Sequence, residues 1–327
     1  MLKIDKLKDR LNDYKGTLKS IKEYGGNAEA ARALARIILQ KPSDAIRSLR
    51  WKAISSGAHV DQLILSFPKF KLAVNVQDGG IASELAVEHS HEPVGTEVFL
   101  SILKDDMTVV EIGANIGYYT VQESCHRKLK RVIAIEPNPL SFELLKENVQ
   151  INDCQDVSVF NMGISDVDGV RPFYISKHAN SGSMTAQAEY ARKLDIPVAK
   201  LDTLMDRENI EHVDVIRMDV EGHEVSALRG MLETLKRDTP WICMEYHAPE
   251  IQADEREIFI STLKALNYEL KCFMFRSDDS PIFGQMLPRR SDVLKRGDLR
   301  EVLEAVTTQS LLLFIAPRTT AFEMPSL

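Results

Sequence analysis

Short apolar runs alternate with amphipathic segments from Met107 onward, and this alternation restricts the fold more than any other feature of the sequence. Such a pattern is typical of a parallel sheet with helices on both faces. Strands are predicted at 107–112, 131–135, 157–162, 213–218, 241–245, 268–275 and 310–315, and helices at about 117–127, 139–151 and 223–236. The sequence therefore predicts an α/β fold with a seven-stranded, mostly parallel, Rossmann-like sheet.

The region before this pattern is different. Apolar residues recur at helical spacing along its start, at Leu7, Leu11, Tyr14, Leu18 and Ile21. The chain has 327 residues, enough for one large α/β domain and a further module. We therefore predict a mainly helical N-terminal module at 1–85, used for substrate or dimer contacts, and a main domain at 86–327.

The charge of the chain is unevenly distributed. The formal net charge is −7, which makes a nucleic-acid partner unlikely for the chain as a whole, yet residues 1–52 carry 13 Lys and Arg against six Asp and Glu. A solvated helix face, packed on the main domain or on a second copy in a homodimer, is one interpretation of this basic region. Peripheral contact with a membrane or with an acidic substrate is the other.

Cysteine usage and hydropathy indicate the compartment. The four cysteines are far apart, with no Cys-x-x-Cys pair, so the sequence predicts neither a structural zinc site nor a disulfide framework. No apolar run is long enough to span a membrane, and the first residues lack the apolar core of a signal peptide. A cytoplasmic location is the simplest expectation.

The segment 109–119, VVEIGANIGYY, carries the clearest ligand-binding signal. An apolar strand leads into a Gly-x-x-x-Gly turn and then a helix, whose first N–H groups face the crevice. The dinucleotide fingerprint Gly-x-Gly-x-x-Gly is absent, because Asn115 stands where the second glycine is needed. A pyrophosphate requires that bare backbone, whereas a nucleoside joined to an amino acid does not. The spacing therefore favours S-adenosylmethionine over a nicotinamide cofactor.

Glu136 ends the next predicted strand, where a carboxylate can accept hydrogen bonds from both ribose hydroxyls. A solvent-facing strand end is the alternative. Main chain near Gly163 and Ile164 is expected to line an adenine pocket or, alternatively, simply to leave the third strand. The residues predicted to bind the cofactor are Glu111, Gly113, Ala114, Asn115, Gly117, Tyr118, Glu136, Pro137, Asn138, Gly163, Ile164 and Asp219.

Four ordered motifs resemble the FkbM family of S-adenosylmethionine-dependent methyltransferases. They are EIGANIGYYT, AIEPNPLSFELLKENVQIN, FNMGISDVDG and IRMDVEGHEVSALRG, within about residues 90–250, and the segments at 180–183 and 198–204 also fit. The resemblance implies a class I methyltransferase fold. It also implies transfer of a methyl group to a hydroxyl oxygen of a sugar, a lipid headgroup or a natural product.

Acidic residues and a histidine follow the fourth and fifth predicted strands, where ligands of open α/β sheets bind. Asp219 is placed near the transferred methyl group, and strand alternation puts Glu245 and His247 on one side. An alcohol needs a base to remove its proton, so His247 or Asp219 is the candidate base, with Glu221 and Glu245 orienting it or the acceptor. A surface histidine without a function is the alternative for His247. Glu224 is interpreted as a helix-charge or capping residue.

The same cluster, with His223 added, contains oxygen and nitrogen ligands that suit Mg²⁺ or Mn²⁺. Nothing in the spacing requires an ion, so no metal is predicted.

Two other functions remain open at this stage. GANIGYYT and AIEPNP are also similar to segments of transfer-RNA guanine methyltransferases, but MDVEGHE lacks the paired prolines frequent after the fourth strand of base-nitrogen enzymes. A non-catalytic protein that retains the cofactor fold is the second alternative. The intact glycine turn and Glu136 argue against it.

Overall fold

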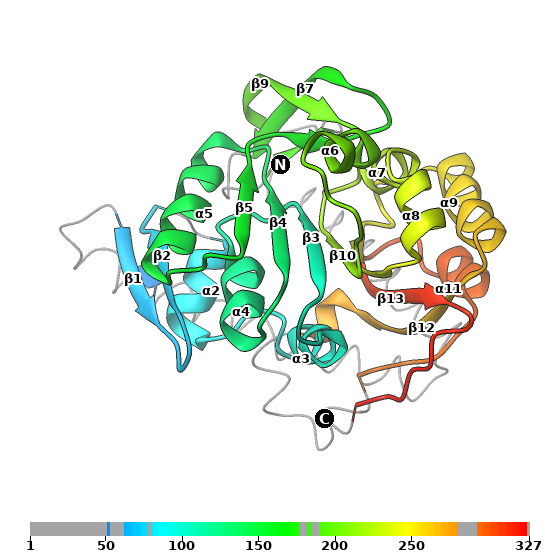
Figure 1. Cartoon of the computed structure of the whole chain (residues 1–327), viewed down its shortest axis with the longest axis horizontal. Helices are drawn as coiled ribbons and strands as arrows, with labels where there is room; N and C mark the ends of the chain where they lie inside the picture. Colours follow the sequence, from blue (N-terminus) through cyan, green and yellow to red (C-terminus); the bar gives the residue numbers. More distant parts are fainter. Residues whose placement is uncertain are drawn as a thin grey trace, which may run out of the picture.

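The computed structural model describes residues 51–52, 62–77, 80–176, 182–184, 190–279 and 293–325. Its centre is a seven-stranded sheet (Figure 1). The helices predicted before residue 51 lie outside the described residues. None of the described helices combines the length and the apolar content needed to cross a membrane.

The central sheet has the order β12-β13-β11-β10-β3-β4-β5. Its strands are β3 (Thr108–Ile112), β4 (Arg131–Ile135), β5 (Val157–Phe160), β10 (Val215–Met218), β11 (Trp241–Tyr246), β12 (Tyr268–Phe275) and β13 (Leu311–Pro317). All neighbouring pairs from β11 to β5 are parallel, whereas β13 runs antiparallel to both β11 and β12. The predicted α/β fold is confirmed, with each strand within two residues of its expected bounds.

The order of the strands places a crevice at one end of the sheet. From β3 the chain continues outward to β4 and β5, then returns to β10 on the other side of β3. Loops that leave in opposite directions separate at this point, which is where open α/β sheets bind ligands. Buried aliphatic side chains from β3, β4 and β10 lie beneath the crevice and belong to one continuous hydrophobic core. They include Ile112, Ile135 and Met218.

Helices cover both faces of the sheet. They are α2 (Ile81–Glu88), α3 (Pro93–Ile102), α4 (Tyr118–His126), α5 (Pro139–Ile151), α6 (Leu201–Arg207), α7 (Glu224–Arg229), α8 (Leu232–Asp238), α9 (Ala253–Ala265) and α11 (Leu299–Ala305). The helix predicted at 223–236 is wrong in one respect, because it divides into α7 and α8 at Gly230. A Cβ at Gly230 would lie 2.0 Å from the Ser165 carbonyl oxygen, so close packing against that backbone requires glycine.

A second, smaller sheet was absent from the prediction. It has the order β6-β9-β7-β8, with β6 (Gly163–Ile164), β7 (Gly169–Ser176), β8 (Gly182–Ser183) and β9 (Tyr190–Ala199). Antiparallel β7 and β9 form a ribbon that lies across one end of the central sheet (Figure 1). The second sheet therefore covers the crevice.

The first described elements after residue 61 are strands. β1 (Gln62–Ser66) and β2 (Lys71–Asn75) form an antiparallel hairpin. Asn148 of α5 accepts a hydrogen bond from the Ala73 N–H (2.6 Å) and donates to the carbonyls of Ala73 (3.0 Å) and Ile116 (2.7 Å). This buried amide joins the hairpin to the main domain. The boundary expected at residue 85 falls inside α2, and the division at that residue remains a prediction.

Candidate active site

A pocket of about 560 Å³, including its open mouth, lies at the carboxyl ends of β3 and β4. The turn after β3 forms one wall. Gly113 has φ +84°, and a Cβ there would lie 1.9 Å from the Asp219 carbonyl oxygen, so glycine is required by the neighbouring strand. Gly117 also has φ +84°, and its Cβ would lie 2.7 Å from Leu145 of α5. Both glycines keep the turn tight enough to leave the crevice open.

Glu136 lies at the end of β4 on the pocket wall. Its side chain is buried, and its two oxygens accept hydrogen bonds of 2.7 Å from the N–H groups of Asn115 and Asn138. Burial raises the pKa of Glu136 to about 7, although both backbone N–H groups lower it. The two hydrogen bonds hold the carboxylate in one orientation at the crevice.

The opposite wall comes from both sheets. Met162, Gly163 and Ile164 follow β5, and Phe173 and Met184 belong to the second sheet or its connection. A Cβ at Gly163 would lie 3.1 Å from the Met184 side chain, so β6 and the residue after β8 pack closely here within the second sheet. The predicted adenine segment does line the pocket. That Phe173 and Met184 line the pocket was not predicted from the sequence. The family-like segment at 180–183 was the one indication in the sequence that this region is important.

Five residues predicted to bind the cofactor do not line this pocket: Glu111, Ala114, Gly117, Tyr118 and Asn138. Glu111 faces away from it and accepts hydrogen bonds from Thr120 and from Arg217 (3.4 Å). Alternation explains this, since Glu111 and pocket-lining Ile112 are adjacent on β3 and point to opposite faces. Tyr118 is buried in the core and donates to the His91 carbonyl oxygen (3.4 Å).

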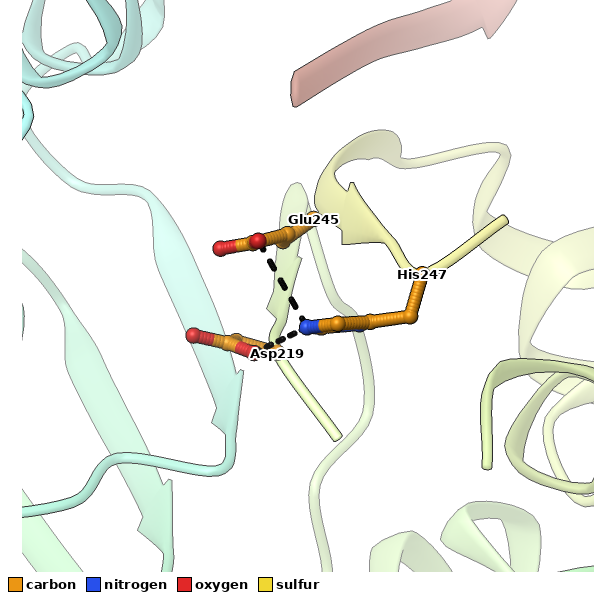
Figure 2. A group of neighbouring side chains, drawn as sticks. All are labelled: Asp219, Glu245 and His247. Carbon is orange, nitrogen blue, oxygen red and sulfur yellow. Dashed lines mark ion pairs between the residues drawn. The ribbon is translucent and has the colours of Figure 1, made fainter. Parts of the chain in front are cut away.

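The predicted acceptor residues converge beside the pocket (Figure 2). Asp219 and Glu221 line the pocket itself. The Nε2 atom of His247 lies 3.3 Å from Glu221, 3.5 Å from Glu245 and 3.8 Å from Asp219. Residues from the ends of β10 and β11 are therefore brought together as the strand positions predicted.

Glu224 is the partner that sequence reasoning did not assign to His247. Its carboxylate is fully buried and lies 2.6 Å from His247 Nδ1, and the same oxygen accepts the His247 N–H at 3.3 Å. Burial lowers the pKa of His247, but the hydrogen bond and charge of Glu224, followed by the charges of Glu245 and Asp219, raise it well above its ordinary value. These contacts favour the protonated form of His247, which disfavours it as a base.

Crowding also changes the two remaining carboxylates. Burial, followed by the charge of Asp219, raises the pKa of Glu221 to about 7, and the same two causes raise that of Glu245 to about 7. Glu221 is the more open of the two, with 40% of its side chain exposed against 11% for Glu245. Each carboxylate at this end of the crevice therefore makes it harder for its neighbours to carry a charge.

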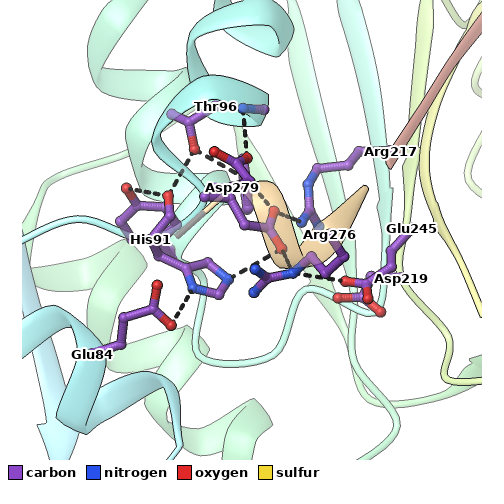
Figure 3. Close-up of polar contacts among 12 residues, drawn as sticks. Glu84, His91, Thr96, Arg217, Asp219, Glu245, Arg276 and Asp279 are labelled. Atoms are coloured by element: carbon purple, nitrogen blue, oxygen red, sulfur yellow. Dashed lines mark hydrogen bonds and ion pairs between the residues drawn. The ribbon is translucent and has the colours of Figure 1, made fainter. Parts of the chain in front are cut away.

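A buried ion-pair network supports the cluster from behind (Figure 3). Arg276, after β12, contacts Glu92 (2.7 Å) and Glu245 (3.3 Å), and Arg217 contacts Glu92 (3.7 Å). Asp279 accepts hydrogen bonds of 2.7 Å from two N–H groups at the start of α3. No motif marks these residues in the sequence, because their partners are far away along the chain.

This strand order, with a glycine turn after the central strand and an acid at the end of the next one, defines a class I methyltransferase. Residues 111–270 match the family model described as the methyltransferase FkbM domain. The chain therefore contains a methyltransferase FkbM domain at residues 111–270, which agrees with the resemblance that the sequence motifs predicted.

Two curated relatives and one solved structure are among the known proteins similar to this chain. Hexuronic acid methyltransferase AglP of Haloferax volcanii is 26% identical over 200 residues, which are 61% of this chain and 80% of the relative. The 2-O-methyltransferase NoeI of Sinorhizobium fredii is 27% identical over 164 residues, or 45% and 66% of the two chains. Among solved structures, methyltransferase FkbM from Methylobacillus flagellatus aligns with 20% identity and a TM-score of 0.36, over 50% of this chain and 38% of that one.

Proposed function

We propose that the pocket binds S-adenosylmethionine and that the enzyme transfers its methyl group to a hydroxyl oxygen of a sugar or a natural product. The observation that carries this proposal is Glu136, a buried carboxylate held by two backbone N–H groups at the edge of a nucleoside-sized pocket. The FkbM domain and the two sugar-related names among the relatives support the class of acceptor.

The pocket residues fit this cofactor chemically. Each oxygen of Glu136 accepts one backbone hydrogen bond, which leaves lone pairs for the two ribose hydroxyls. Asn115 also lines the pocket, and its Oδ1 atom is buried without a hydrogen-bond partner among the described residues. A buried polar atom of this kind is costly unless a ligand satisfies it. Ile135, Met162 and Phe173 supply apolar surface for a base.

S-adenosylmethionine, when bound, supplies an electrophilic methyl group. The chain must then align the acceptor hydroxyl and receive its proton. Its surroundings favour the protonated form of His247, so we assign the proton to one of the carboxylates that line the pocket, Asp219 or Glu221. Glu221 is favoured on geometry, since its side chain is the more exposed of the pair. Glu224 and His247 hold the carboxylates in place.

Calorimetric titration with S-adenosylmethionine tests the proposal. Glu136→Gln should weaken binding at least about tenfold, because the amide removes the negative charge and one pair of acceptor sites. Glu143→Gln is the matched control, since Glu143 lies on α5 with 68% of its side chain exposed and should bind like the wild type. Equal affinity in Glu136→Gln and the wild type would refute the ribose assignment.

A further inference from the structure

Three metal-ligating side chains meet at the mouth of the pocket. Asp219, Glu245 and His247 each offer one ligand atom, and these atoms all lie within 4.8 Å of one another (Figure 2). They come from the ends of two neighbouring strands, so the rigid sheet sets their positions. Residues on rigid elements hold a coordination geometry better than residues on loops do.

The spacing matches a small divalent cation. With bonds of about 2.1 Å, neighbouring ligands of an octahedral ion lie about 3.0 Å apart and opposite ligands about 4.2 Å apart. His247 Nε2 is 3.5 Å from Glu245 Oε1 and 3.8 Å from Asp219 Oδ1, between these two values. An ion could therefore enter with small side-chain rotations and no movement of the strands.

Supporting contacts aim each ligand at the shared point. Buried Glu224 holds His247 Nδ1 at 2.6 Å, which leaves Nε2 directed at the carboxylates. Arg276 lies 3.3 Å from one oxygen of Glu245, and the other oxygen faces His247. A carboxylate behind a histidine and a donor behind a carboxylate are the usual outer partners of metal ligands.

Two further observations favour a cation at this point. Asp219 Oδ1 is buried and forms no hydrogen bond within the part of the chain that the structure describes. The His247 side chain is only 9% exposed, yet Asp219, Glu221 and Glu245 all crowd its Nε2 atom. Three carboxylates at one point repel one another, and a cation at the centre would take the place of a proton on Nε2 and reduce that repulsion.

We propose that Asp219, Glu245 and His247 bind a divalent cation of the Mg²⁺ and Mn²⁺ class. One nitrogen and several oxygen ligands suit these ions, which also retain open positions for other oxygen ligands. An acceptor hydroxyl, or two neighbouring hydroxyls of a sugar, would occupy those positions. The cation site stands on the geometry alone, whereas its use in methyl transfer depends on the proposed function.

Titration of the full chain with Mn²⁺, followed by the electron paramagnetic resonance signal of free Mn²⁺, tests the site without cofactor or acceptor. The wild type should bind one ion. Asp219→Asn and Glu245→Gln, which preserve side-chain volume, should each weaken binding at least about tenfold. Glu224→Gln should weaken it by about tenfold through the orientation of His247.

His212→Ala is the matched control. His212 also lies beside two carboxylates, but its Nε2 faces Asp214 (3.2 Å) and its Nδ1 faces Asp238 (3.3 Å). Ligands on opposite ring nitrogens cannot share one ion with the histidine, so this variant should bind Mn²⁺ like the wild type. Thermal unfolding of every variant verifies that it is folded before its affinity is compared.

The proposal is overturned if the wild type binds no stoichiometric Mn²⁺, or if Asp219→Asn and Glu245→Gln bind it as the wild type does. Calorimetry with S-adenosylmethionine separates this result from the proposed function. Mn²⁺ binding without cofactor binding would retain the cation site and refute the function. Cofactor binding without Mn²⁺ binding would refute the cation site and retain the proposed function.

Discussion

Asp219 links the two halves of the site at the scale of single residues. Its carbonyl oxygen limits the space at Gly113, whereas its side chain lies near His247 at the acceptor end. Its backbone N–H is bonded to Ile112 on the neighbouring strand (2.9 Å), so the main chain does not depend on the carboxylate. Binding and chemistry should therefore respond differently to a change at this position.

Asp219→Asn should bind S-adenosylmethionine within about threefold of the wild type but transfer methyl groups about 100-fold more slowly, because a negative charge beside the reacting atoms is lost. Cofactor binding is measured by calorimetry. Methyl transfer is measured by the release of S-adenosylhomocysteine in the presence of the same sugar acceptor for the wild type and the variant. Wild-type turnover in this variant would remove Asp219 from the chemistry.

At the scale of elements, the β7–β9 ribbon completes the pocket. Phe173 is buried on its inner face with Ile196 and Val198, and its ring also lies on the pocket wall. A Cβ at Gly182 would lie 2.4 Å from that ring, so the small residue makes room for the phenylalanine. Strand β8, which pairs with β7, is attached to the loop after β10, because the Ser183 hydroxyl donates a hydrogen bond to the Glu221 carbonyl oxygen (2.6 Å).

Phe173→Ala should weaken binding of S-adenosylmethionine about tenfold, because an apolar wall of the pocket is removed. Val170→Ala is the control on the same strand, since 67% of Val170 is exposed and it does not line the pocket. Calorimetry on both variants decides the matter. Equal losses in the two variants would indicate a general disturbance of the ribbon rather than a pocket contact.

At the scale of the whole molecule, the Glu92 network connects parts that are distant in sequence. Glu92 precedes α3, Arg217 lies on β10 and Arg276 follows β12. Burial opposes the charge on Glu92, but Arg276, His91 and Arg217 outweigh it and lower its pKa from 4.5 to about 2. A carboxyl whose pKa is lowered by folding stabilises the native state above its unfolded pKa, and loses that effect as the pH falls towards the folded value.

Glu92→Gln should lower the free energy of unfolding at pH 7 by about 3 kcal/mol, since the buried guanidinium of Arg217 and the partly buried one of Arg276 lose a charged partner. The difference between wild type and variant should shrink as the pH falls below about 4.5. Urea denaturation at several pH values between about 7 and 3 measures both effects. A difference that is independent of pH over that range would contradict the assigned ion pairs.

The sequence by itself determined the features that depend on neighbouring residues. Apolar runs and their spacing predicted the strands of the central sheet, because burial on both faces requires continuous apolar side chains. The glycine turn at 113–117 and the acid Glu136 could also be predicted, because the backbone geometry at these positions is local. Strand alternation also placed Glu245 and His247 on one side.

Only the tertiary structure decided which of these residues face the pocket and which partners they have. The contact between Glu224 and His247, the ribbon over the pocket and the ion pairs of Arg276 join segments far apart in the chain. The need for glycine at position 230 likewise comes from the Ser165 backbone, which sequence spacing does not bring near. Such contacts depend on how elements pack, and packing is set by the whole core rather than by local spacing.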